Sequence, residues 1–140
     1  MTINETGRGD VRVLAPGGRL TVETVAVFDA SVREAFAAGQ MQLVLDLSGV
    51  PYVDSCGLGA LAHAYVAAFR RGGSVRLANV NGRNRRLLSI TRLLTVFEVF
   101  DSAEEAVRRF DREAADDQRP EEARNRSTTA RNAAGISSLG

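Results

Sequence analysis

Short apolar runs alternate with helical patterns along the chain, and this alternation restricts the fold more than any other feature of the sequence. The run at residues 42–47 (QLVLDL) is nearly continuous, which is typical of a central strand covered on both faces. Further strand patterns lie at residues 11–15, 74–78 and 97–100. Helical patterns follow each of them, so the order predicts an α/β domain with a mixed sheet.

The helical patterns carry recognisable ends. The first two span residues 24–38 and 56–71, and glycines follow both of them, as is common after a helix. The third spans residues 81–90, with apolar positions that include Ile90. Ser102 begins the last one and is followed three residues later by a glutamate, which is a capping-box pattern.

The C-terminal part of the sequence differs from the rest. Beyond residue 110 the only large apolar residues are Ile136 and Leu139, among charged residues, Ala, Asn and Ser. Such a segment buries too little apolar surface to offset the entropy lost on ordering. The sequence therefore predicts one ordered domain over residues 1–112 and a disordered charged tail over residues 113–140.

Composition excludes several function classes. The 18 basic residues, all Arg, nearly balance 17 acidic ones, so a net charge of +1 gives no general attraction to nucleic acid or anionic membrane. Residues 1–10 carry no apolar run, and the mostly apolar stretch at 58–69 is too short to cross a bilayer. With a single cysteine and no expected disulfide or membrane segment, we expect a reduced, cytoplasmic protein.

The sequence also argues against catalysis. His63 is the only histidine, so it cannot build a metal site, and its apolar neighbours suggest a structural position near the core or its edge. A phosphate-binding loop that ends in Gly-Lys is impossible without lysine. We expect no catalytic residues, no metal, no cofactor and no enzyme activity.

The segment at residues 50–61 (VPYVDSCGLGAL) carries the most information. It predicts a strand end, a tight turn and a helix start, where Asp54 and Ser55 offer oxygens to free backbone N–H groups. Gly57 and Gly59 allow a close approach by another backbone or another protein. A helix N-terminus also tolerates a phosphate on a hydroxyl at its edge. The simpler alternative is that Asp54 and Ser55 only cap the helix.

The stretch at residues 43–61 resembles the signature of the STAS domain, and specifically of anti-sigma factor antagonists. The resemblance continues through Gly18-Arg19-Leu20, the run GGSVRL at residues 72–77 and the C-terminal third, in register over residues 9–112. It implies a STAS-type (SpoIIAA-like) single α/β domain. The expected architecture is a mixed central sheet of four to five strands with helices packed mainly on one side.

The family resemblance implies a switch. Ser55 would be phosphorylated by an anti-sigma factor serine kinase of the histidine-kinase-like ATPase fold, and a metal-dependent serine phosphatase would reset it. Unphosphorylated protein would bind the kinase and release a sigma factor, which is partner switching in the regulation of transcription during stress or sporulation. The residues expected to bind the partner are Thr21, Asp54, Ser55, Cys56, Gly57, Leu58 and Gly59.

Three positions depart from the family pattern. Cys56 stands where Ser or Thr is usual, and we expect a small residue packed in a turn rather than a redox sensor. Thr21 stands at a position that is often Asp. Arg92 replaces a common Gly, which predicts a different backbone shape after residue 90.

Between Ser55 and Phe97 there is no acidic residue, but there are seven arginines. The simpler interpretation is a solvent-exposed face on which the aliphatic parts of the arginine side chains lie over apolar neighbours. The alternative is a basic surface that complements an acidic partner, and nucleic acid is less favoured because no stacking platform is visible. Two other functions stay open: a STAS scaffold of a larger signalling complex without phosphorylation, and a small-ligand or nucleotide-binding STAS domain.

Overall fold

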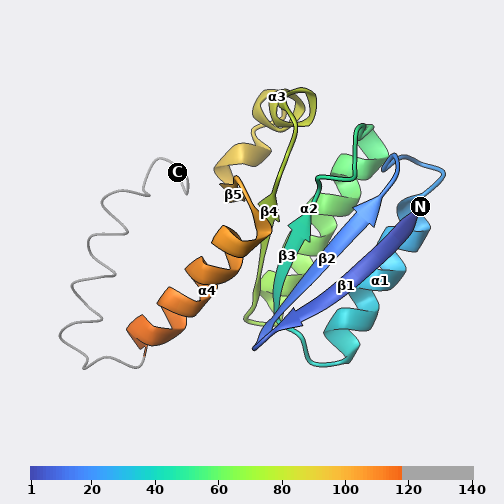
Figure 1. The fold of residues 1–140 in the computed structure, drawn as a ribbon. Helices are drawn as coiled ribbons and strands as arrows, with labels where there is room; N and C mark the ends of the chain where they lie inside the picture. The colour runs from blue at the N-terminus through green and yellow to red at the C-terminus, as the bar shows by residue number, and fades with distance from the viewer. Residues whose placement is uncertain (118–140) are drawn as a thin grey trace.

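The computed structural model describes residues 1–117, which form one five-stranded sheet (Figure 1). The strands are β1 (Thr2–Arg8), β2 (Val11–Gly17), β3 (Gln42–Asp46), β4 (Ser74–Ala78) and β5 (Val99–Phe100), in this spatial order. β1 is antiparallel to β2, whereas the other neighbours are parallel. The predicted mixed sheet of four to five strands is confirmed.

Four helices cover the two faces unequally. They are α1 (Val25–Ala37), α2 (Ser55–Arg70), α3 (Gly82–Ile90) and α4 (Ala103–Asp117), with a 3₁₀ turn at Leu93–Thr95. Residues of α1, α2 and α3 share one buried cluster, and α4 packs on the opposite face of the sheet, as Figure 1 shows. Helices therefore lie mainly on one side, as expected.

Successive side chains of the central strands point to opposite faces of the sheet and so enter the two buried clusters in turn. Leu43 and Leu45 of β3 face α1 and α2, whereas Val44 between them faces α4, and all three are fully buried. Burying one such side chain contributes about 1.5–3 kcal/mol. This explains why residues 42–47 form a nearly continuous apolar run, since both faces of β3 need it.

The structure differs from the sequence predictions at two elements. β1 was not predicted, because it is an exposed edge strand with hardly any apolar alternation. α4 continues to Asp117, past the predicted domain boundary at residue 112. The rest of the predicted tail, residues 118–140, lies outside the described residues.

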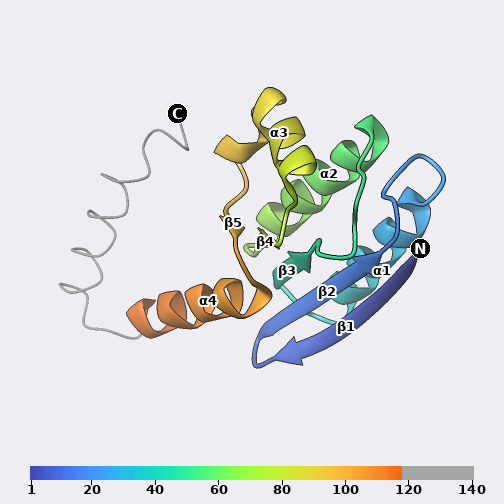
Figure 2. The ribbon, with the colours of Figure 1, turned by 45° about the horizontal axis from the view of Figure 1, so that its top comes forward.

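Parallel strands bring three loops to one edge of the sheet. Since β2, β3 and β4 run in the same direction, the loops after them meet at their carboxyl ends (Figure 2). The loop after β3 leads directly into α2. Within residues 1–117, no helix has the combination of length and apolar character needed to span a bilayer.

Candidate functional site

Ser55 is the first residue of α2 and its side chain is exposed. Asp54 precedes it in an extended conformation as the N-cap residue, and its Oδ1 accepts a hydrogen bond from the backbone N–H of Gly57 at 2.9 Å. This bond satisfies one of the free donors of the first helical turn. The cap predicted from the sequence is present, and it leaves the Ser55 hydroxyl at the surface.

The Asp54 carboxylate is held in its charged form by backbone donors. The N–H of Gly57 is the main cause that lowers the pKa of Asp54 below its ordinary value of 3.8, and the N–H of Val22 contributes through Oδ2 at 3.2 Å. Hydrogen bonds to a carboxylate favour its ionised form. A full negative charge therefore stands beside Ser55 at neutral pH.

The loop before α1 closes the site on one side. Leu20 pairs with Val53 in a parallel bridge, its N–H donates to the carbonyl of Tyr52 at 2.9 Å, and its carbonyl accepts from Asp54 at 3.2 Å. Gly57 lies buried against this segment, and a Cβ there would overlap the carbonyl oxygen of Leu20. The close backbone approach anticipated at Gly57 is thus made by the chain itself.

The other predicted partner residues lie around Ser55. Cys56 and Gly59 are exposed, and Gly59 has open space where a side chain would stand. Leu58 is half-buried and packs against the core. Thr21 is half-buried and lines a shallow cavity of about 400 Å³ together with Asp54. The fold therefore gathers these residues at one end of α2, with Gly57 beneath the surface.

Two arginines near Ser55 have roles that sequence patterns did not reveal. The guanidinium groups of Arg19 and Arg83 lie 4.4 and 4.0 Å from the centre of the Tyr52 ring. Cation–π contacts of this kind are favourable by about 0.5–1 kcal/mol each at exposed sites. They place two positive charges on the loop that leads to Ser55, and they were missed because the three residues are far apart in sequence.

The arginine-rich segment divides into structural and exposed members. Arg76 is buried on the α4 face, 2.6 Å from Glu113 and 3.8 Å from the centre of the Phe110 ring. Arg71 lies over Phe36. These contacts agree with the interpretation that arginine side chains of this segment lie over apolar neighbours. Arg76 is the only buried arginine of the segment, and the other six are exposed, namely Arg70, Arg71, Arg83, Arg85, Arg86 and Arg92.

Arg92 adopts a left-handed backbone with φ of +64°. Glycine takes up this conformation readily, whereas other L-residues do so at a cost. The replacement of a family glycine by Arg92 therefore does not by itself require a different loop.

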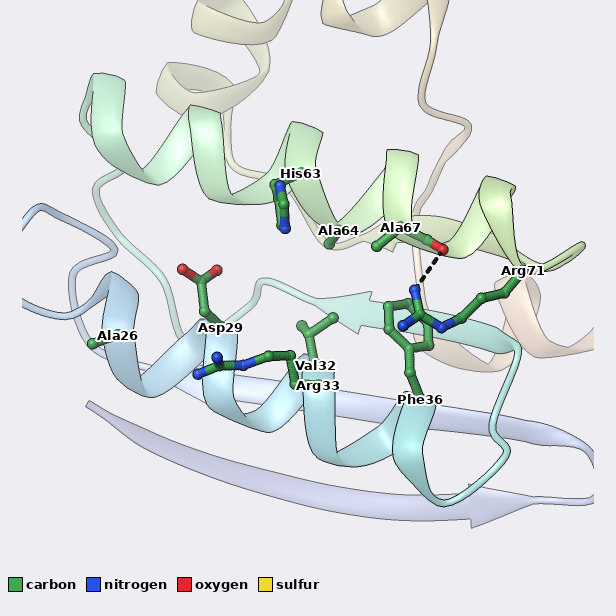
Figure 3. A pocket seen from close by; sticks show the side chains of 9 residues that line it. All are labelled: Ala26, Asp29, Val32, Arg33, Phe36, His63, Ala64, Ala67 and Arg71. Atoms are coloured by element: carbon green, nitrogen blue, oxygen red, sulfur yellow. Dashed lines mark hydrogen bonds between the residues drawn. The ribbon is translucent and has the colours of Figure 1, made fainter.

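A second cavity of about 400 Å³ lies between α1 and α2, away from Ser55. Figure 3 shows Asp29 and His63 pointing into it from opposite helices, while Arg71 folds across its end and donates to the carbonyl of Ala67 at 3.1 Å. His63 is exposed on α2 and lies beside buried residues of this cavity, so it is at the edge of the core and not within it. Within residues 1–117, no three His, Cys, Asp or Glu side chains cluster as a metal site would require.

Family comparison covers nearly all of this structure. The model of the STAS domain matches residues 2–106, which include every strand and the whole surroundings of Ser55. The chain belongs to the STAS domain family. This confirms the resemblance seen in the sequence and the predicted STAS-type fold.

Relatives of this STAS domain have names that describe one kind of regulator. A Thermotoga neapolitana protein provisionally named an anti-sigma factor antagonist is 32% identical over 99 residues, 70% of this chain and 88% of that protein. Mycobacterium tuberculosis RsfB, an anti-sigma-F factor antagonist, is 28% identical over 116 residues, 80% and 95% of the two chains. These names describe antagonists rather than enzymes.

A solved structure agrees with them. The crystal structure of a Thermotoga maritima protein, provisionally named an anti-sigma factor antagonist, matches with a TM-score of 0.73 and 27% identity. The match covers 76% of this chain and 92% of that chain.

Proposed function

We propose that this STAS domain is an anti-sigma factor antagonist controlled by phosphorylation of Ser55. Its unphosphorylated form binds an anti-sigma factor that is a serine kinase of the histidine-kinase-like ATPase fold, and so releases a sigma factor in the cytoplasm. A serine phosphatase restores the binding form. The protein regulates transcription through these contacts and catalyses no reaction itself.

The exposed Ser55 hydroxyl at the start of α2 carries this proposal. A kinase must reach the acceptor oxygen, and a buried or structural serine would be out of reach. Asp54 supplies the cap instead of Ser55, since Oδ1 of Asp54 accepts from Gly57 at 2.9 Å. Modification of Ser55 therefore leaves the first turn of α2 intact.

A phosphate on Ser55 would be tolerated by the domain. It adds about −1.5 to −2 charges, and the N-terminus of α2 stabilises such a charge by about 0.3–1 kcal/mol. Arg19 and Arg83 add positive charge nearby, whereas the ionised Asp54 opposes it. These effects are small and partly cancel, so phosphorylation should not unfold the protein.

The same phosphate would be costly at an interface. Burying a doubly charged group without a dedicated partner costs several kcal/mol, and each ~1.4 kcal/mol is a tenfold loss of affinity. Exposed neighbours that a partner would cover include Cys56 and Gly59. The switch therefore acts by preventing contact.

Intact-mass measurement after incubation with the anti-sigma factor kinase and ATP tests the acceptor. The wild-type protein should gain one phosphoryl group mapped to Ser55, while Ser55→Ala should gain none and still bind the kinase. Ser89→Ala is the matched control, because it removes an exposed serine on α3, outside the predicted partner residues, and should be labelled normally. Equal labelling of Ser55→Ala would overturn the assignment.

A further inference from the structure

The loop that leads into α2 is held by side chains from the first turn of α3. Asn84 Nδ2 donates to the carbonyl of Val50 at 3.0 Å. Asn81 Nδ2 donates to the carbonyl of Pro51 at 3.1 Å. Arg83 Nη1 donates to the carbonyl of Val53 at 3.2 Å. Three nearby side chains, from the N-cap and first turn of α3, thus hold a loop that lies 30 or more positions away in sequence.

The remaining carbonyls of this loop are also engaged. Tyr52 accepts from the N–H of Leu20 and Asp54 accepts from the N–H of Leu58, both at 2.9 Å. Every carbonyl from residue 50 to residue 54 therefore has a donor within the protein. Each hydrogen-bonded group restricts a backbone that would otherwise be free, which fixes the direction in which the next residue leaves the loop.

Asn84 is the centre of this arrangement. Its side chain is 2% exposed, and its Oδ1 accepts from Arg83 Nη1 at 3.1 Å while its Nδ2 reaches Val50. Its backbone N–H donates to Oδ1 of Asn81, the N-cap residue of α3, at 2.8 Å. Because Asn84 is buried, it cannot touch a docked protein, and any effect on Ser55 must pass through the loop.

We propose that Asn84, with Arg83, is a positioning residue for phosphoryl transfer to Ser55. The inference rests on the proposed function and adds to it the part of the fold that orients the acceptor. In the transfer, Ser55 Oγ bonds to the γ-phosphorus of ATP, the bond from that phosphorus to the bridging oxygen breaks, and ADP leaves. The hydroxyl proton passes to a base of the kinase.

Fixing the loop before Ser55 should affect the rate of phosphoryl transfer more than the affinity with which the kinase docks. Reacting groups held in the right geometry avoid an entropic cost at the transition state, and a small misplacement lowers the rate by as much as about a hundredfold. Replacing buried Asn84 removes no side chain from the exposed surface around Ser55. Loss of positioning should therefore appear in kcat and leave KM nearly constant.

Steady-state phosphorylation of the full chain by the anti-sigma factor kinase, with ATP, tests this. Asn84→Ala should lower kcat about tenfold, with KM within about twofold of wild type. Asn84→Asp serves if the alanine variant folds poorly, because it keeps size and the Oδ1 acceptor but removes the donor to Val50. Arg85→Ala is the matched control, an exposed charge loss on the same helix that should leave kcat unchanged.

Amide hydrogen exchange supplies a readout without the kinase. In both Asn84 variants, the N–H groups of Asp54 and Gly57 should exchange about tenfold faster relative to the N–H of Leu77 in the core. Unchanged exchange, or unchanged kcat in both variants while wild type is labelled, would overturn this inference and leave the proposed function standing. Absence of label on wild-type Ser55 would overturn both.

Discussion

Oδ2 of Asp54 accepts a hydrogen bond from the backbone N–H of Val22 at 3.2 Å, across 32 positions of sequence. The carboxylate that caps α2 therefore also fixes the loop before α1. The Val22 side chain is 65% exposed beside this bond. Two of the segments proposed to meet the partner are thus held together by one side chain, so a change at Asp54 should loosen both.

Asp54 should make stability depend on acid pH. Because its pKa is lower in the folded protein than its ordinary 3.8, its ionised form contributes stability that is complete above that value. This contribution is lost as pH falls through the lower folded pKa. In the variant Asp54→Asn, the side-chain oxygen still accepts a hydrogen bond from the backbone N–H of Gly57, but the side chain carries no charge. Melting temperatures of the wild type and Asp54→Asn, measured from pH 6 to pH 2, should therefore differ most at pH 6, and the difference should shrink as the pH falls. A constant difference would be evidence against this role.

Gly57 and Gly59 should respond oppositely to alanine. A Cβ at Gly57 would overlap the carbonyl oxygen of Leu20 and lie 2.8 Å from Val53 Cγ1, so Gly57→Ala should destabilise the domain by about 2–3 kcal/mol. Gly59 has open space inside the same helix, so Gly59→Ala should stabilise it by about 0.5–1 kcal/mol. Urea unfolding of both variants measures these changes in the free energy of unfolding. No change for Gly57→Ala would show that the contact between Gly57 and the Leu20 carbonyl is not tight.

Arg76 should anchor α4. Its side chain is 7% exposed, between Glu98 and Glu113, and its buried Nη1 has no hydrogen-bond partner within the described residues. Arg76→Ala should cost about 3 kcal/mol, because it leaves Glu113 without this ion pair and opens a space over the Phe110 ring. Arg76→Met should cost less, since it still fills the space over the Phe110 ring.

The control for Arg76 is its exposed neighbour. Arg109 lies 3.7 Å from Glu98 with 45% of its side chain exposed, so Arg109→Ala should change the free energy of unfolding by less than about 1 kcal/mol. Guanidinium chloride screens surface charges, so urea is the suitable denaturant. Equal losses for Arg76→Ala and Arg109→Ala would refute the anchoring role.

Arg92→Gly should stabilise the protein. The left-handed backbone of Arg92 costs about 1–2 kcal/mol for an L-residue, and the greater freedom of unfolded glycine returns part of this. A net gain of about 0.5 kcal/mol is expected from urea midpoints. Arg86→Gly, within α3, should instead lose about 1 kcal/mol. A loss for both variants would show that the Arg92 side chain matters more than its backbone.

Burial pattern explains which elements were predictable. β3 and β4 are covered on both faces, so their residues are mostly apolar, apart from the buried Arg76 of β4, and their bounds follow closely from sequence. β1 pairs with β2 at the edge and buries little, so its residues Thr2–Arg8 carry no apolar signal. The available sequence signal was Gly9-Asp10, which forms the turn between β1 and β2, with Gly9 in a left-handed conformation.

The surroundings of Ser55 show a similar limit. The cap by Asp54 is local, since donor and acceptor are three residues apart, and it was predictable from the sequence. The bonds from Asn84 and Arg83 to the loop depend on which loops the parallel strands bring to one edge. Polar residues in a helix pattern give no sign of such contacts, so the role of Asn84 was not predicted.

The blocking effect of phosphate is most directly measured as a difference in affinity. Titration calorimetry would compare unphosphorylated protein with protein phosphorylated at Ser55, each against the same anti-sigma factor, with Ser55→Glu as a stable mimic. The predicted result is binding by the unphosphorylated form and at least about tenfold weaker binding by the phosphorylated form, a cost of ~1.4 kcal/mol or more. Equal affinity of the two forms would contradict the phosphorylation switch.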